Sequence, residues 1–65
     1  MLDNDVKVIR SMEDKRFNLD GTSYSIIHVE FMVGNHGPFT ERFPKDTYTA
    51  IMRDNKLNEF AREVR

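Results

Sequence analysis

The segment SYSIIHVEFMV, residues 23–33, constrains the fold of this chain more than any other stretch. From residue 27 onward its odd positions are all apolar, whereas the even positions mix aromatic, aliphatic, histidine and acidic side chains. Alternation with a period of two places the odd set on one buried face of a β-strand. We therefore expect a central strand whose odd face contacts the core. The odd set is Ile27, Val29, Phe31 and Val33.

A further extended segment is predicted upstream of this strand. Val6, Val8 and Met12 begin an alternating run through VKVIRSME. The NLDGT segment that follows contains an Asp-Gly pair, which is typical of a tight hairpin connection. A two-residue turn at this pair would set Glu13 opposite His28.

The downstream stretch VGNHGPFTERFPKD, residues 33–46, predicts a second hairpin with two possible registers. A four-residue loop, residues 34–37, would pair two glutamates and turn both phenylalanines away from the core. A five-residue loop, residues 34–38, sets Val33 opposite Phe39 and Glu30 opposite Arg42. Apolar side chains then meet on the inner face and opposite charges meet on the outer face, so we favour the five-residue loop.

A helix is predicted for TYTAIMRDNKLNEFAREVR, with Asp46 or Thr47 as its N-cap. Its apolar residues form two sets at helical spacing that are out of step between Met52 and Leu57. Asp and Asn, which occupy the break, are good caps and poor interior residues, so we expect a kink or a restart near Asp54. The predicted fold class is α+β: a three-stranded antiparallel β-meander followed by a C-terminal helix packed on one sheet face.

Length and composition limit the functions that this chain can have. A chain of 65 residues forms a single domain, 1–65, that buries about 60% of its unfolded surface, and we expect residues 1–5 to be frayed. The ten Lys and Arg residues alternate along the chain with eleven Asp and Glu residues. The chain therefore lacks the basic patch that is typical of a nucleic-acid or membrane-surface protein. The absence of cysteine, of a secretory signal and of a run of about 20 apolar residues predicts a soluble, cytoplasmic protein.

Candidate catalytic and metal-binding residues are few. His28 and Glu30 share one face of the central strand and could act as an acid/base pair or as half of a metal site, or they could belong to a solvated cross-strand charge ladder. A metal takes three or four ligands, and the remaining candidates, His36 and Asp20, have no ligand spacing. Nucleophile elbows and phosphate loops are absent as well. We expect a non-enzymatic protein without metal, cofactor or small-molecule substrate.

The even face of the central strand is the strongest functional lead. It carries more apolar area than a water-facing sheet needs, and we expect Ile9 and Phe17 of the preceding strand to extend it. Because one helix cannot cover both faces of a sheet, this face is either a binding surface for a protein partner or a second copy, or a surface with scattered apolar residues. The expected contacts are Tyr24, Ile26, His28 and Met32, with Glu30 and Arg42 as a rim pair.

Two further modes of interaction remain open. The outer strands of a three-stranded meander have free edges, which a partner chain can extend. A small sheet that bears Tyr24, Phe17 and Arg42 can also stack single-stranded bases, so a weak nucleic-acid-binding domain is the alternative function.

The stretch HGPFTERFPKDTYTA, followed by a helix rich in Ala, Glu and Arg, resembles short proteins of unknown function encoded in phage and prophage genomes. The resemblance covers the last half of the chain and rests on the G-P-F-x-x-x-F-P spacing of residues 37–44. It implies an accessory or assembly role, in which a small domain docks on a larger protein. It implies no catalytic residues.

Overall fold

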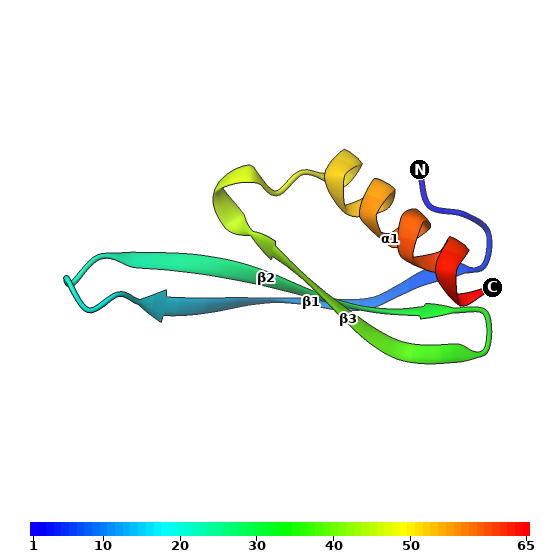
Figure 1. The fold of residues 1–65 in the computed structure, drawn as a ribbon, viewed down its shortest axis with the longest axis horizontal. Helices are drawn as coiled ribbons and strands as arrows, with labels where there is room; N and C mark the ends of the chain where they lie inside the picture. Colours follow the sequence, from blue (N-terminus) through cyan, green and yellow to red (C-terminus); the bar gives the residue numbers. More distant parts are fainter.

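The computed structural model describes residues 1–65 as an α+β fold, a three-stranded antiparallel sheet followed by a C-terminal helix. The elements are β1 (Val6–Phe17), β2 (Ser23–Val33), β3 (His36–Pro44), a short 3₁₀ turn η1 (Lys45–Thr47) and α1 (Ala50–Val64). The sheet order is β1-β2-β3, so the predicted central strand and the predicted meander are confirmed. Figure 1 shows α1 lying over one face of the sheet, while no element covers the other face.

The core lies between the odd face of β2 and α1. Val29, Phe31 and Val33 are fully or almost fully buried, as the alternation in the sequence predicts. Leu57 and Ala61 of α1 are buried against them. Burial of large apolar side chains is the main stabilising contribution in so small a domain, because each contributes about 1.5–3 kcal/mol.

A β-bulge interrupts β1 and reverses which of its side chains face the helix. Val8 pairs with Phe31, but Arg10 pairs with Glu30, so that Ile9 is an extra residue on β1. Before the bulge, β1 therefore directs valines toward α1, whereas after it Met12 faces away from the helix. The single alternating run predicted for Val8 and Met12 is wrong at this point.

The first hairpin has a three-residue loop in place of the expected two-residue turn. The Asn18 amide donates to the Thr22 carbonyl at 2.8 Å, and the Gly21 amide donates to the Asn18 carbonyl at 3.1 Å. This is the pattern of a turn followed by a left-handed residue, and it shifts the register by one. Met12, and not Glu13, is consequently paired with His28.

The second hairpin also differs from the predicted register. β2 and β3 are joined by a two-residue turn, residues 34–35, and Gly37 and Pro38 together lie opposite the single residue Met32, which forms a second bulge. Phe39 consequently pairs with Phe31 and not with Val33. The error amounts to two residues, and a shift of two keeps every side chain on its predicted face, since the period of a strand is two.

The helix is continuous from Ala50 to Val64, so the predicted break near Asp54 is wrong. Arg53 occupies the position in helical phase with Leu57, and its side chain is only 27% exposed, so its aliphatic stem continues the buried stripe where an apolar residue was expected. The Asp54 carboxylate accepts from Arg53 at 3.0 Å and lies 3.3 Å from the N-terminal amine. Because the carboxylate is held by these two partners, it does not compete for the hydrogen bonds of the helix backbone.

The predicted caps are wrong as well. Thr49, and neither Asp46 nor Thr47, is the N-cap, and its hydroxyl accepts from the Met52 amide at 3.0 Å. Asp46 and Thr47 belong to η1, and the extended residue that follows, Tyr48, packs on Phe43 with ring centroids 5.4 Å apart. This aromatic contact delays the start of the α-helix.

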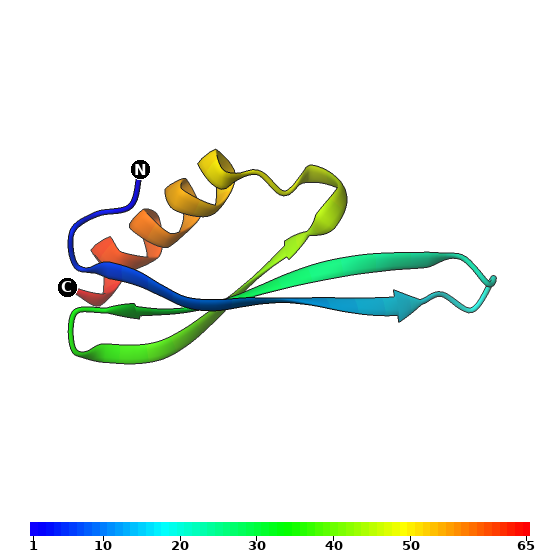
Figure 2. The same cartoon turned by 180° about the vertical axis from the view of Figure 1, so that it is seen from behind.

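The β1–β2 hairpin extends beyond the part of the sheet that α1 covers. Figures 1 and 2 show its tip projecting as a two-stranded arm, with the helix and both termini at the opposite end of the molecule. The molecule measures 42 × 20 × 18 Å. Large apolar side chains are exposed on this arm, including Phe17 at 73% and Leu19 at the tip.

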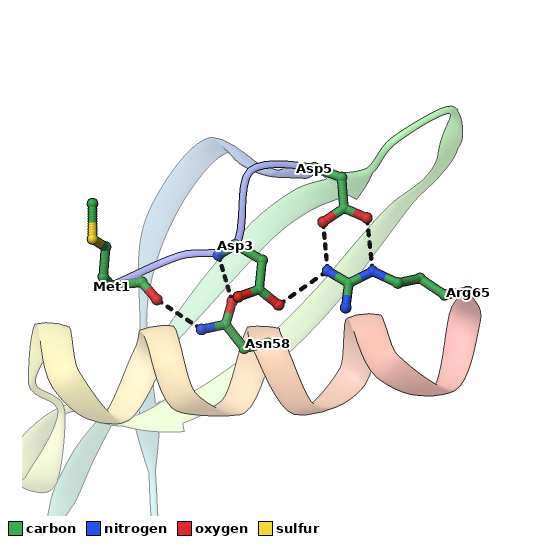
Figure 3. A network of polar contacts seen from close by, with 5 residues as sticks. All are labelled: Met1, Asp3, Asp5, Asn58 and Arg65. Carbon is green, nitrogen blue, oxygen red and sulfur yellow. Dashed lines mark hydrogen bonds and ion pairs between the residues drawn. The ribbon is translucent and has the colours of Figure 1, made fainter.

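Residues 1–5 lie along α1 and are joined to it by polar contacts (Figure 3). Asn58 accepts from the Asp3 amide at 2.8 Å and donates to the Met1 carbonyl at 2.7 Å. Arg65 donates to the carboxylate of Asp5 at 2.8 Å and to that of Asp3 at 3.0 Å. The expected fraying concerns motion and stays a prediction, although these contacts oppose it.

Candidate functional site

The candidate site is the face of the sheet opposite α1, which we call the open face. It consists of the even side chains of β2 and the residues paired with them on β1 and β3. The structure brings all six predicted contact residues together on it, since the alternation of β2 and the pairing of Arg42 with His28 place them on one side. The six residues are Tyr24, Ile26, His28, Glu30, Met32 and Arg42.

Apolar side chains form a strip along the open face that His28 and Glu30 of β2 interrupt. Tyr24 is 45% exposed, while Ile26 and Met32 are half-buried among their neighbours. Met12, 52% exposed, joins this strip from β1. Phe17, which was expected here, pairs with Ser23 and therefore lies on the other face, since it comes after the bulge of β1.

The predicted rim pair of Glu30 and Arg42 is wrong. Glu30 pairs with Thr40 on β3 and forms an ion pair with Arg10 of β1, Nε to Oε1 at 3.2 Å. Arg42 lies opposite His28 and makes no ion pair within the chain. The two-residue difference in register explains both changes, because it moves each β3 residue along the strand without changing its face.

The histidine of the open face has a different carboxylate neighbour from the one expected. His28 Nε2 lies 3.5 Å from Asp14 Oδ2, and the same oxygen accepts from Arg16 Nε at 2.8 Å. Glu13, the expected neighbour, lies on the other face and pairs with Lys45 at 2.6 Å. The chain has no group of three or more His, Cys, Asp or Glu placed to hold a metal ion.

Basic side chains outnumber acidic ones on the open face. Asp14 and Glu30 are the acidic residues, and each is paired with an arginine of β1. Two cations, Lys7 and Arg42, have no acidic partner. The open face therefore carries an interrupted apolar strip together with a net positive charge, and its two unpaired cations lie on the outer strands.

An apolar hollow lies where the open face meets the end of β3. It has a volume of about 270 Å³ and is lined by Tyr24, Ile26, Arg42, Phe43 and Pro44. β3 ends here, because Pro44 pairs with Ile26 and β2 continues beside β1 alone. Reasoning from the sequence missed Met12 and Pro44 at the site, since their places depend on bulges and registers that no local pattern reveals. Phe43 borders the hollow, but it pairs with Ile27 and its side chain is buried in the core on the helix side, as expected.

Four of the five marked pKa shifts of this chain belong to ion pairs away from the open face, and the fifth is at Asp20, whose pKa is lowered by hydrogen bonds from Thr22 in the first hairpin loop. Hydrogen bonds from the Arg65 side chain hold the pKa of Asp5 below its ordinary value of 3.8. Desolvation raises the pKa of Asp54, but hydrogen bonds from Arg53 and the N-terminal amine outweigh it, and the net pKa is lowered. These shifts mark contacts that hold the termini to the fold.

A second hollow lies on the opposite side of the molecule, between β3 and α1. Its volume is about 240 Å³, and Glu41, Glu59 and Glu63 surround Phe60 and Lys56 there. The helix side of the molecule is therefore acidic at this point, in contrast to the open face.

Comparisons with known proteins add no family to these observations. No family model, no curated protein and no solved structure matches this chain. None of its helices combines the length and the apolar character that crossing a membrane requires.

Proposed function

We propose that this chain is a non-enzymatic interaction module that binds a protein through the open face of its sheet. The observation that carries the proposal is that α1 covers one face only, which leaves the apolar strip of Met12, Tyr24, Ile26 and Met32 without a covering element. Exposed apolar side chains gathered on one face among polar ones are typical of a protein-binding surface.

The occupant is a protein partner or a second copy of this chain. An accessory or assembly role, as the resemblance to phage-encoded proteins implies, stays a hypothesis and fits a domain that acts by docking.

The free edges of β1 and β3 are less suited to binding a partner than the open face is. β1 carries a bulge at Ile9, and β3 carries one at Gly37 and Pro38. Bulges and prolines at sheet edges prevent pairing with another chain. An occupant of the face is therefore favoured over a strand added at either edge.

Weak binding of single-stranded nucleic acid is the second candidate, because basic residues exceed acidic ones on the open face. Tyr24 supplies one exposed aromatic ring there, whereas base-stacking sheets use several. Binding of this kind would weaken steeply as salt is raised. A titration with oligothymidylate at low and high salt tests it.

The experiment that tests the main proposal replaces Ile26 and Met32 together by Lys. The matched control is Ile51→Lys, which places the same charge on α1 at a side chain that is 73% exposed. Molar mass is measured against concentration by light scattering, and proteins captured on the immobilised chain are compared among the three forms after nuclease treatment. Circular dichroism verifies that each variant is folded.

We expect the double variant to lose whichever interaction the wild-type chain shows, self-association or capture of a partner. The Ile51→Lys control should retain that interaction. The reason is that two lysines on the apolar strip must be desolvated in any interface that covers it. A wild-type chain that is monomeric and whose β2 amides gain no protection from exchange with any captured partner contradicts the proposal.

A further inference from the structure

The apolar hollow at the end of β3 has the shape and chemistry of a receptor for one side chain. Four of its five lining residues are apolar or aromatic, namely Tyr24, Ile26, Phe43 and Pro44. The hollow is shallow and open, and its volume of about 270 Å³ lies at the lower limit of the roughly 300–1,000 Å³ of small-molecule sites. An open apolar depression of this kind can receive one apolar side chain of a partner protein.

Arg42 at the border of the hollow has no acidic group to neutralise it. The other arginines of the open face are paired, Arg10 with Glu30 at 3.2 Å and Arg16 with Asp14 at 2.8 Å. The cross-strand neighbour of Arg42 is His28, which supplies no negative charge. A guanidinium beside an apolar surface binds a carboxylate in a fixed, bidentate geometry.

We infer that the hollow receives an apolar side chain from an acidic segment of a partner protein, and that a neighbouring carboxylate of this segment pairs with Arg42. The inference rests on the proposed function and adds to it the place and the chemistry of recognition. The charge of the open face supports an acidic partner, since Lys7 and Arg42 are both free to pair.

A symmetric dimer through this region is disfavoured. In a two-fold interface each surface meets its own copy, so the unpaired cations of one chain would approach those of the other. Nucleic acid is disfavoured because Phe43 is only 4% exposed, which leaves Tyr24 as the one ring at the hollow that a base could stack on.

The test uses a blocked peptide, Asp-Glu-Leu-Phe-Glu-Asp, titrated into the full chain and followed by the amide NMR spectrum. Two matched peptides separate the contributions: in one the acidic residues are replaced by Lys, and in the other Leu and Phe are replaced by Ala. We expect the acidic, apolar peptide to shift the amides of Tyr24, Ile26 and Phe43. Each matched peptide should bind at least about tenfold more weakly, since charge and burial both contribute.

Charge reversal supplies the second test. Arg42→Glu should weaken binding of the acidic peptide by at least about tenfold, and it should strengthen binding of the Lys-containing peptide. The matched control is Arg62→Glu, an exposed residue of α1 without an ion pair, which should change binding by less than about twofold. Equal weakening by both variants overturns the inference, because it would reflect the net charge alone.

Other outcomes separate this inference from the proposed function. If the peptide shifts only amides near Lys7 and Met32, the hollow is not the site, although the open face still binds protein. If the amides at the hollow shift as the concentration of the chain is raised without peptide, a second copy of the chain occupies the hollow. This result overturns the inference of an acidic partner. If oligothymidylate displaces the peptide and the displacement weakens strongly as salt is raised, the face binds nucleic acid. This result overturns both the inference and the proposed protein-binding function.

Discussion

Gly37 sets the end of the open face, and its replacement by Ala is a sensitive test of the β3 bulge. Its φ of +126° belongs to a region that side chains rarely adopt. A Cβ at this position would lie 2.8 Å from the Met32 sulfur and 3.2 Å from both the Phe31 carbonyl oxygen and the Phe39 nitrogen. The thioether can rotate away, but the two backbone atoms are fixed by the sheet.

The expected cost has two parts. A strained backbone of this kind costs about 1–3 kcal/mol, and overpacking against fixed atoms adds about 1–3 kcal/mol. Domains are stable by about 0.05–0.15 kcal/mol per residue, so the 65 residues of this chain correspond to a free energy of unfolding of only a few kcal/mol to about 10 kcal/mol. Gly37→Ala should therefore remove a large part of the stability.

The assay is urea unfolding followed by circular dichroism. The matched control is Gly34→Ala, where φ is +57° and a Cβ would meet nothing within 4 Å, so only the left-handed conformation costs about 1–2 kcal/mol. Adding Met32→Ala to Gly37→Ala should recover only the part of the loss that is due to the sulfur. If Gly37→Ala costs no more than Gly34→Ala, or if Met32→Ala restores full stability, the bulge geometry is not what requires glycine.

Three other perturbations test the fold that supports the site. Leu57→Ala, at a fully buried side chain, should lower the free energy of unfolding by about 2–5 kcal/mol in thermal or urea unfolding. Ile51→Ala, on the exposed side of the same helix, should lower it by less than about 0.5 kcal/mol. Similar values for the two variants would contradict the orientation of the helix. Thr49→Ala should cost about 1 kcal/mol, because the N-cap hydrogen bond is lost, and an unchanged midpoint would argue for another cap. Because the folded pKa of Asp5 is lowered, its ion pair with Arg65 stabilises the fold above the ordinary Asp pKa of 3.8 and is lost as pH falls below it. Arg65→Met should therefore flatten the acid limb of the stability curve, and an unaltered limb would refute this.

The buried faces of β2 and of α1 follow from the sequence. The alternation through Ile27 and Val33 identifies the buried side of β2, and the stripe that contains Leu57 and Ala61 identifies the buried side of α1. Both patterns are local, because the period of a strand or a helix fixes which side chains share a side. The six predicted contact residues come together on the open face for the same reason.

The registers and the helix boundaries do not follow from the sequence. Registers that differ by two residues present the same faces, so only pairwise contacts between distant strands distinguish them, and these selected Phe39 opposite Phe31. The bulge at Ile9 moved Met12 to the open face and Phe17 away from it. A bulge depends on the partner strand, so it has no signature in its own strand that alternation alone can show.

The sequence by itself therefore determined the α+β class, the central strand and the two buried faces, because these depend on periodicity within one segment. Tertiary structure decided the continuity of α1 through Asp54, where charges from Arg53 and from the chain's first residue pair with the carboxylate. It also decided that Arg42 stands unpaired at the border of the apolar hollow. The contact of the N-terminal amine with Asp54 and the strand register around Arg42 depend on groups far apart in the chain, and only folding determines which of them become neighbours.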